Sequence, residues 1–222
     1  EIVFTARLSS EGFIDPASAD SDSTDANFDL NEVEISFLFD MGAVSAQVDT
    51  EYATATGSGQ LDQAFISYDV FGGTLSAGLM DSQLGFEAFE APGLYTNTLA
   101  YSNGVNSQLP ATDEGIKFTK QLDAVSSIGV ALSNGGDTFI GDESTGQDTT
   151  IEVAYGRDLG NGLGAFVGLR SEANGDDLMN AYVTYETGAF MFAAEIVDGE
   201  IDSDLQLLAN YAYASNASNC TV

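Results

Sequence analysis

The chain has 222 residues, of which 35 are Asp or Glu and 5 are Lys or Arg, so its formal net charge is -30. A charge of this sign excludes nucleic acid as a partner, because phosphate binding needs clustered Lys and Arg. The absence of histidine excludes Ser–His and Cys–His nucleophile pairs and His-ligated metal sites, and we expect no enzymatic activity.

The composition indicates one folded, strand-rich domain. The hydrophobic fraction is 44%, with 24 Gly, 3 Pro and no Trp, which suits strands joined by tight turns. The single cysteine, Cys220, allows no disulfide within the chain. No basic and apolar leader opens the sequence, so we expect a mature exported form. The sequence contains no run of about 18 apolar residues, the length that would predict a transmembrane helix. The strands of a transmembrane barrel need only about 9–11 alternating residues each.

Apolar and polar residues alternate with period two along most of the chain, as in half-exposed strands. Val33, Ile35 and Phe37, for example, alternate with Glu34 and Ser36. This pattern predicts about twelve strands. They are expected near residues 1–13, 28–40, 44–54, 60–70, 74–80, 112–122, 125–133, 149–158, 163–172, 177–187, 189–198 and 203–214.

The connections between these segments alternate between short and long. Tight turns are expected at 41–43, 71–73, 123–124, 161–162 and 188. Longer connections are expected at 15–27, 55–59, 81–111, 134–148 and 174–177. Short periplasmic turns and longer extracellular loops are typical of a transmembrane antiparallel up-and-down β-barrel. We therefore predict an all-β bacterial outer-membrane barrel over residues 1–214, with a C-terminal tail over 215–222.

The two faces of the predicted strands differ in charge. One face carries Phe, Tyr, Ile, Val, Leu and Ala, and we assign it to the lipids of the outer membrane. The other face is polar, and twelve strands enclose more than the side-chain-filled interior of an eight-stranded barrel. We predict a wet lumen lined by Arg7, Glu32, Glu34, Asp49, Glu51, Asp69, Lys117, Glu152, Arg170, Glu186 and Glu195.

The 81–111 connection is too long for a passive loop and is rich in apolar and aromatic residues. Folded into the lumen, it would narrow the pore and place Asp81, Glu87 and Glu90 at the constriction. Acidic rings favour cations because they raise the local cation concentration. The alternative is that the loop is a plug or a contact between subunits of a homo-oligomer.

Three acidic residues of the first long loop, Asp20, Asp22 and Asp25, are a weak Ca²⁺ candidate because carboxylates are the ligands that Ca²⁺ prefers. The segment lacks the Gly and the distal Glu of an EF-hand, so a solvated acidic loop is the simpler interpretation. We predict no other metal and no cofactor. The overall acidic excess is also what a protein from a salty environment would carry for solvation.

Several segments carry a family resemblance. They are Phe28–Phe37, Leu61–Tyr68, Leu75–Tyr95 and Ala131–Gly135, and the most specific part is Gly85-Phe-Glu followed by Glu90-Ala-Pro-Gly. In these segments the chain resembles the OmpL-like β-barrel porin family. The resemblance implies an outer-membrane diffusion channel without enzyme activity. Members of that family are longer, and outer-membrane barrels typically end in an aromatic residue, whereas here a tail follows Tyr213.

Three hypotheses of function remain open at this point. The first is a porin that passes small hydrophilic solutes and ions and prefers cations. The second is a non-conducting scaffold or surface-assembly barrel plugged by the long loop. The third is a soluble acidic β protein that binds Ca²⁺ or carbohydrate, which would be extracted without detergent.

Overall fold

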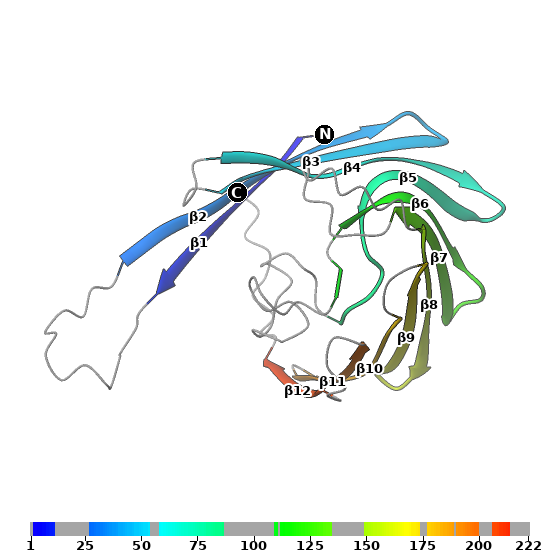
Figure 1. Cartoon of the computed structure of the whole chain (residues 1–222). Coiled ribbons are helices and arrows are strands. Elements are labelled where there is room, and N and C mark those ends of the chain that lie inside the picture. The colour runs from blue at the N-terminus through cyan, green and yellow to red at the C-terminus, as the bar shows by residue number, and fades with distance from the viewer. Residues whose placement is uncertain are drawn as a thin grey trace, which may run out of the picture.

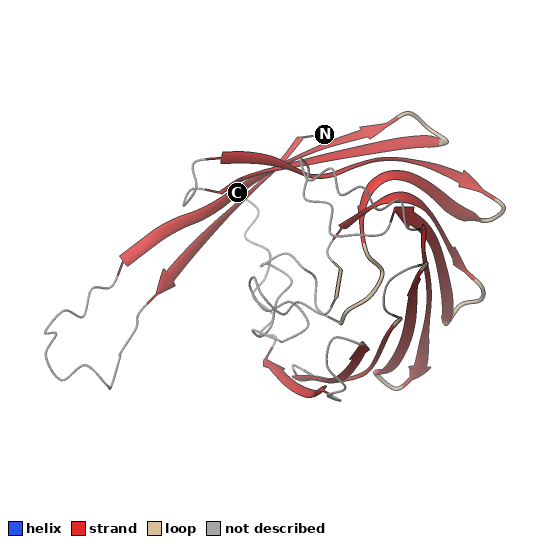
Figure 2. Cartoon of the chain, viewed as in Figure 1, coloured by secondary structure: helices blue, strands red, loops and turns tan. Residues whose placement is uncertain are grey.

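The structure is a computed structural model of the 222-residue chain. It describes residues 2–11, 27–53, 58–86, 109–110, 112–134, 149–173, 177–188, 190–199 and 206–213. For residues 2–11, 27–32, 53 and 206–213 it describes the backbone alone. These ranges are all strands, turns and connections, and they hold no helix long and apolar enough to cross a membrane (Figure 2).

Twelve strands follow one another along the chain, as the alternation of apolar and polar residues predicts. Their bounds are β1 Ile2–Glu11, β2 Asn27–Asp40, β3 Val44–Ala53, β4 Ser58–Val70, β5 Gly73–Asp81, β6 Thr112–Gln121, β7 Ser126–Asn134, β8 Thr149–Gly160, β9 Leu163–Glu172, β10 Leu178–Thr187, β11 Phe190–Gly199 and β12 Gln206–Tyr213. Most of these bounds differ from the predicted ones by no more than a residue or two.

Each strand pairs antiparallel with its neighbours in sequence, in the order β1 to β12. The sheet curls, so that β3 and β4 lie opposite β10 to β12, with β6 to β8 joining the two sides (Figure 1). Within the described residues the end strands β1 and β12 do not pair with each other. An up-and-down sheet that curls in this way is the architecture of a meander barrel.

The tight turns lie where the sequence predicts them. Asn161 and Gly162 join β8 to β9 with φ angles of 56° and 80°. Two positive φ angles define a type I′ turn, whose twist matches the flanking strands, and Asn-Gly is the dipeptide that adopts it most readily. In the β6–β7 turn the amide of Val125 donates to Asp123 Oδ1 at 2.9 Å. This hydrogen bond lowers the pKa of the Asp123 carboxyl below its ordinary value.

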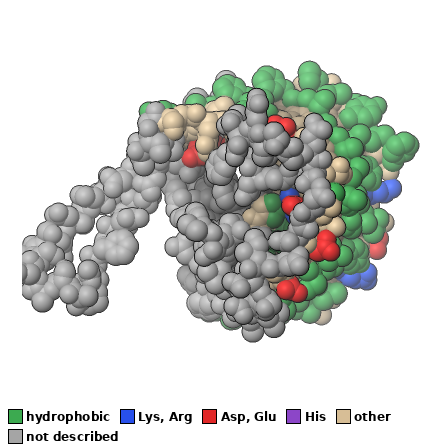
Figure 3. All heavy atoms as spheres, in the orientation of Figure 1, with side chains coloured by type: hydrophobic (Ala, Val, Ile, Leu, Met, Phe, Trp, Pro, Cys, Tyr) green, Lys and Arg blue, Asp and Glu red, His purple; other side chains and the backbone are tan. Residues whose placement is uncertain are grey.

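Apolar residues cover the convex face of the sheet. Exposed large side chains alternate with buried residues along the strands, for example Ile151 and Val153 with Glu152 and Ala154. On β9, Val167 and Leu169 alternate with Gly168 and Arg170 in the same way. Figure 3 shows the hydrophobic side chains spread over the outer surface. The sheet is therefore apolar outside and polar inside, the reverse of a soluble barrel.

The regular pairing of β3 and β4 is interrupted by a β-bulge. Asp49 pairs with Gln63, whereas the next residue, Thr50, pairs with Leu61. Asp62 is the extra residue between these two pairs. A bulge of this kind changes the face to which neighbouring side chains point, and Asp62 lies within electrostatic reach of Asp49, Glu34 and Glu51.

Candidate functional site

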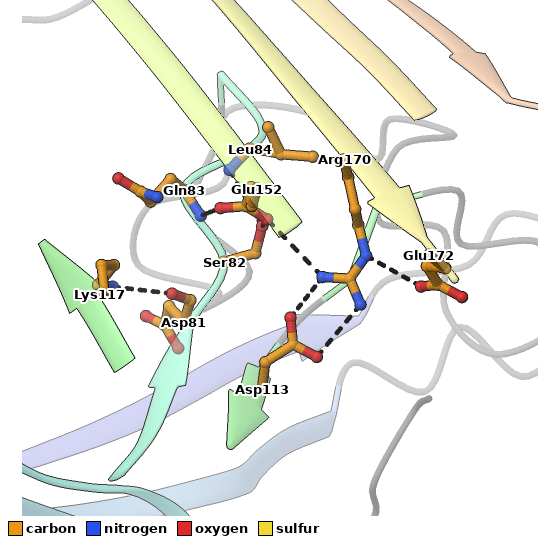
Figure 4. A network of polar contacts seen from close by, with 9 residues as sticks. All are labelled: Asp81, Ser82, Gln83, Leu84, Asp113, Lys117, Glu152, Arg170 and Glu172. Carbon is orange, nitrogen blue, oxygen red and sulfur yellow. Dashed lines mark hydrogen bonds and ion pairs between the residues drawn. The ribbon is translucent and has the colours of Figure 1, made fainter. Parts of the chain in front are cut away.

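The residues that follow β5 cross the inside of the curved sheet and attach to its far wall (Figure 1). Ser82 Oγ donates to Glu152 Oε2 at 2.7 Å, and the amide of Gln83 donates to Glu152 Oε1 at 2.7 Å. Glu152 belongs to β8 and is only 3% exposed. Both of its carboxylate oxygens are therefore occupied by the segment 82–86 (Figure 4).

Two further strands hold the same segment. The amide of Gly85 donates to Asn180 Oδ1 on β10, and the amide of Phe86 donates to Glu195 Oε1 on β11, both at 2.9 Å. Asn180 also donates to Glu195 Oε1 at 2.7 Å, so the two acceptors fix each other. Hydrogen bonds to a charged group contribute about 1.5–3 kcal/mol each. The segment 82–86 is therefore a fixed part of the inner wall.

An apolar cluster lies between this segment and the wall. Leu84, Leu109 and Val197 are buried, and Phe166 and Leu178 pack against them. The ring of Phe86 meets Tyr182 edge-on at 5.4 Å between centroids, and Tyr182 stacks on Phe166 at 4.6 Å. Aromatic pairs in these geometries add about 0.5–1.5 kcal/mol each to the burial itself. The core of the described barrel thus lies on the β9–β11 side of the lumen.

Glycines on the inner wall make room for the segment. A Cβ atom at Gly168 would overlap with the side chain of Leu84, and one at Gly129 would overlap with the amide group of Gln83. Gly168 is buried and alternates with the convex-face residues Val167 and Leu169. At these two positions any side chain would occupy the volume that the segment 82–86 fills.

Arg170 is the centre of an ion network beside this segment (Figure 4). Its guanidinium donates to both carboxylate oxygens of Asp113, and the distance from Nη2 to Oδ1 is 3.2 Å. It also approaches Glu152 at 3.7 Å and donates to Glu172 at 3.0 Å. Arg170 is 5% exposed. Removing a buried charge of this kind leaves its partners unpaired, which typically costs about 3–5 kcal/mol.

Lys117 makes the second basic contact of the inner face. Its Nζ donates to the backbone carbonyl of Asp81 at 2.9 Å, and the side chain lies within electrostatic reach of Glu152. The predicted constriction residue Asp81 therefore lies where the segment leaves β5, with an exposed side chain.

A different set of carboxylates lines the wall formed by β2, β3 and β4. Asp49 is 1% exposed and accepts from Gln47 Nε2 at 2.6 Å. Glu34 accepts from Ser36, and Glu51 accepts from Gln60. Together with Asp62 we call these residues the acidic wall: Glu34, Asp49, Glu51 and Asp62.

The predicted lumen residues fall into three groups. Glu152, Arg170 and Glu195 are buried on the β8–β11 side, Glu34, Asp49 and Glu51 lie on the acidic wall, and Lys117 lies between the two sides. Asp69 and Glu186 are exposed near the tight-turn ends of β4 and β10. Arg7 and Glu32 are paired through their backbones in β1 and β2, and the structure does not describe their side chains. For all of these residues, the role of lining a pore stays a prediction.

Other predicted residues lie outside the described ranges. These are the constriction residues Glu87 and Glu90 and the Ca²⁺ candidates Asp20, Asp22 and Asp25. Among the residues that the structure describes, no group of three or more acidic or cysteine side chains is arranged to hold a metal ion.

Sequence reasoning missed four residues of the site. Asp62 shares the parity of Ala64 and Ile66, so alternation alone assigns it to the lipid face, and only the bulge brings it to the acidic wall. Asp113 has the parity of Lys117, a signal that could have placed it on the inner face. Asn180 and Gly168 share the parity of Glu186 and Arg170, which places them on the inner face, but no sequence signal indicates their partners, which are distant in the chain.

The fold and this inner face define a class of protein, the outer-membrane β-barrels. A loop-deletion form of OmpT, an outer membrane protein of Vibrio cholerae, has a TM-score of 0.50 and 12% identity, and the match covers 93% of this chain and 68% of that chain. This likeness confirms the predicted fold class.

Two other solved structures are similar at lower TM-scores, and no argument is based on them. A mutant of the Rh. blastica porin has a TM-score of 0.46 and 8% identity over 82% of this chain and 54% of that chain. The outer membrane channel DcaP of Acinetobacter baumannii has a TM-score of 0.42 and 10% identity over 90% of this chain and 79% of that chain. This chain therefore spans about half the length of the Rh. blastica porin mutant.

No family model and no curated protein sequence matches the chain. The resemblance to the OmpL-like porin family stays a prediction.

Proposed function

We propose that the protein is a porin-like channel of the bacterial outer membrane, through which small hydrophilic solutes and ions diffuse passively, with a preference for cations. The observation that carries the proposal is the reversed distribution of polarity, with exposed apolar residues on the convex face and buried carboxylates on the concave face. A lipid-facing exterior and a polar lumen are what a water-filled barrel needs.

The charge of the lumen supports the cation preference. Among the described inner-face residues, carboxylates outnumber the basic groups Lys117 and Arg170, and acidic linings favour cations electrostatically. The proposal places outer-membrane lipids around the barrel and includes membership of the OmpL-like porin family. It includes no catalysis, no cofactor and no nucleic-acid partner. Assembly into a homo-oligomer is a further part of it, which chemical crosslinking in detergent tests.

The test is conductance in a planar lipid bilayer. The detergent-purified, folded barrel is added at known concentration, and the reversal potential is read under a KCl gradient. Stable conductance steps with a cation-selective reversal potential are the expected result. A protein that is folded by its heat-dependent shift in gel mobility but is electrically silent would contradict the channel and favour a scaffold barrel plugged by the long loop.

A further inference from the structure

The carboxylates of the concave face differ in what neutralises them. On the β6–β11 side they have strong donors: Asp113, Glu152 and Glu172 lie at Arg170. Glu195 accepts from the amide of Phe86 and from Asn180. The positive charge of Arg170 opposes the field of the three carboxylates beside it and so reduces their combined field at a distance.

The described donors to the acidic wall are all neutral. The donors to Glu34, Asp49 and Glu51 are a hydroxyl and two neutral amides, from Ser36, Gln47 and Gln60. Within the side chains that the structure describes, no basic residue forms an ion pair with any of the four carboxylates. Among the described side chains, the negative charge of the acidic wall is therefore not opposed by an ion-paired basic group.

Asp49 provides the observation that points to a mobile ligand. Its side chain is 1% exposed, yet its Oδ1 has no hydrogen-bond partner. A buried carboxylate oxygen without a donor is costly. The bulge adds Asp62 to the same group, within electrostatic reach of Glu34, Asp49, Glu51 and Asp81. Such a cluster is stabilised when a cation stands beside it.

Four of the five basic residues make their described contacts away from this wall. Lys117 binds the carbonyl of Asp81, Lys120 binds the carbonyl of Phe71 at 2.8 Å, and Arg157 contacts Ser126 and Tyr155. Arg170 holds its own three carboxylates. The fifth basic residue, Arg7, lies on β1, and its side chain is outside the described part.

The opposite wall is covered by a part of the chain. There the segment 82–86 fills the space over β8 to β11, with Leu84 in an apolar cluster and Gly168 beneath it. A hydrated ion loses its hydration in such a cluster and gains no compensating ligand. The described contacts of the segment 82–86 are with β7 to β11 and not with the acidic wall.

From these observations we infer that the permeation path is off-centre, along the wall of β2 to β4, and that Glu34, Asp49, Glu51 and Asp62 set the preference for cations. The inference rests on the proposed channel function and deepens it. The ligand class is a small hydrated cation that moves in the combined electrostatic field of these carboxylates, without a fixed metal site.

The experiment compares two triple variants that remove the same charge. Glu34→Gln/Asp49→Asn/Glu51→Gln removes three charges from the acidic wall. Asp40→Asn/Asp123→Asn/Asp158→Asn removes three exposed carboxylates at the tight-turn end. The ratio of K⁺ to Cl⁻ permeability, from reversal potentials in a KCl gradient, is expected to fall by about threefold or more in the first and to change little in the second.

The outcomes separate this inference from the proposed function. If the wild-type barrel conducts but both triple variants keep its permeability ratio, the channel stands and the acidic wall is overturned as its filter. If the folded wild-type barrel is silent, both proposals are overturned. Asp62→Asn provides a second variant for the case in which the triple variant does not fold, and its ratio is expected to move in the same direction.

Discussion

Gly168 and Leu84 share one small volume of the inner wall. The side chain of Leu84 fills the place where a Cβ at Gly168 would stand, and Leu84 is 3% exposed. Interiors are packed at the density of organic crystals, so an extra methyl group there must displace something. The contact is long-range in sequence, and it ties the segment 82–86 to β9.

This pairing predicts strong coupling between two substitutions. Gly168→Ala is expected to lower the free energy of unfolding by about 1–3 kcal/mol through overpacking, and Leu84→Ala by about 2–5 kcal/mol through the cavity it leaves. In the double variant the new methyl group enters that cavity, so the loss should fall at least about 1 kcal/mol short of the sum. Urea-induced unfolding in lipid vesicles measures all three values.

Gly59→Ala is the matched control, because a Cβ there meets only ordinary van der Waals contacts. It should leave stability nearly unchanged. Strict additivity of Gly168→Ala and Leu84→Ala would show that the two groups do not share this volume.

At the scale of single residues, alternation alone predicted that Glu152, Arg170 and Glu195 are on the inner face, and the structure buries all three. It could not predict which of them are neutralised. That depends on Asp113 and on the amides of Gln83 and Phe86, which approach only in the folded sheet. Nor could it assign Asp62, because a one-residue bulge reverses the parity on which the assignment rests.

Among the elements, the segment 82–86 is held by hydrogen-bond acceptors from three strands, β8, β10 and β11. We predict that its amides are protected from hydrogen exchange, although they belong to no strand. Asn180→Leu removes the acceptor of the Gly85 amide. Because an intramolecular hydrogen bond contributes about 1 kcal/mol, exchange at Gly85 should become at least about fivefold faster.

Hydrogen–deuterium exchange with mass spectrometry in detergent measures this change. Thr187→Ala, at the exposed turn end of the same strand, should leave the Gly85 amide as slow as in the wild type. Rapid exchange of the segment in the unmodified protein would show that it is not fixed to the wall.

The strands and turns were largely predictable because their signals are local. Period-two alternation marks β2 to β5 and β7 to β11, and Asn161-Gly162 marks the β8–β9 turn. The attachment of the 82–86 segment was not predictable in detail, because the acceptors Asn180 and Glu195 come from strands near the other end of the chain. The aromatic and apolar composition of the loop indicated only that it packs against something.

For the whole molecule, the convex face determines whether the barrel is stable in a bilayer. Val167 lies near the middle of β9 on this face and is 39% exposed. Val167→Arg places a charge among lipid chains. It should lower the free energy of unfolding in vesicles by about 2–4 kcal/mol.

Leu159→Arg is the control, because Leu159 is equally apolar but adjoins the β8–β9 turn. Near the interface the same charge costs only about 0–1 kcal/mol. The expected order, with Val167→Arg much the more destabilising, is read from urea titrations in vesicles. Equal losses, or folding of the wild type without detergent or lipid, would contradict the membrane barrel.

The attachment of the segment 82–86 also constrains the order of assembly. Strand pairing joins sequence neighbours and can proceed hairpin by hairpin, whereas the amides of Gln83, Gly85 and Phe86 bind acceptors that lie 69, 95 and 109 residues away in sequence. Contacts of such separation form late, because closing a long loop costs chain entropy before any contact is gained. The full set of contacts is therefore complete only after β11 has joined the sheet, so the final attachment of the segment is a late event in folding.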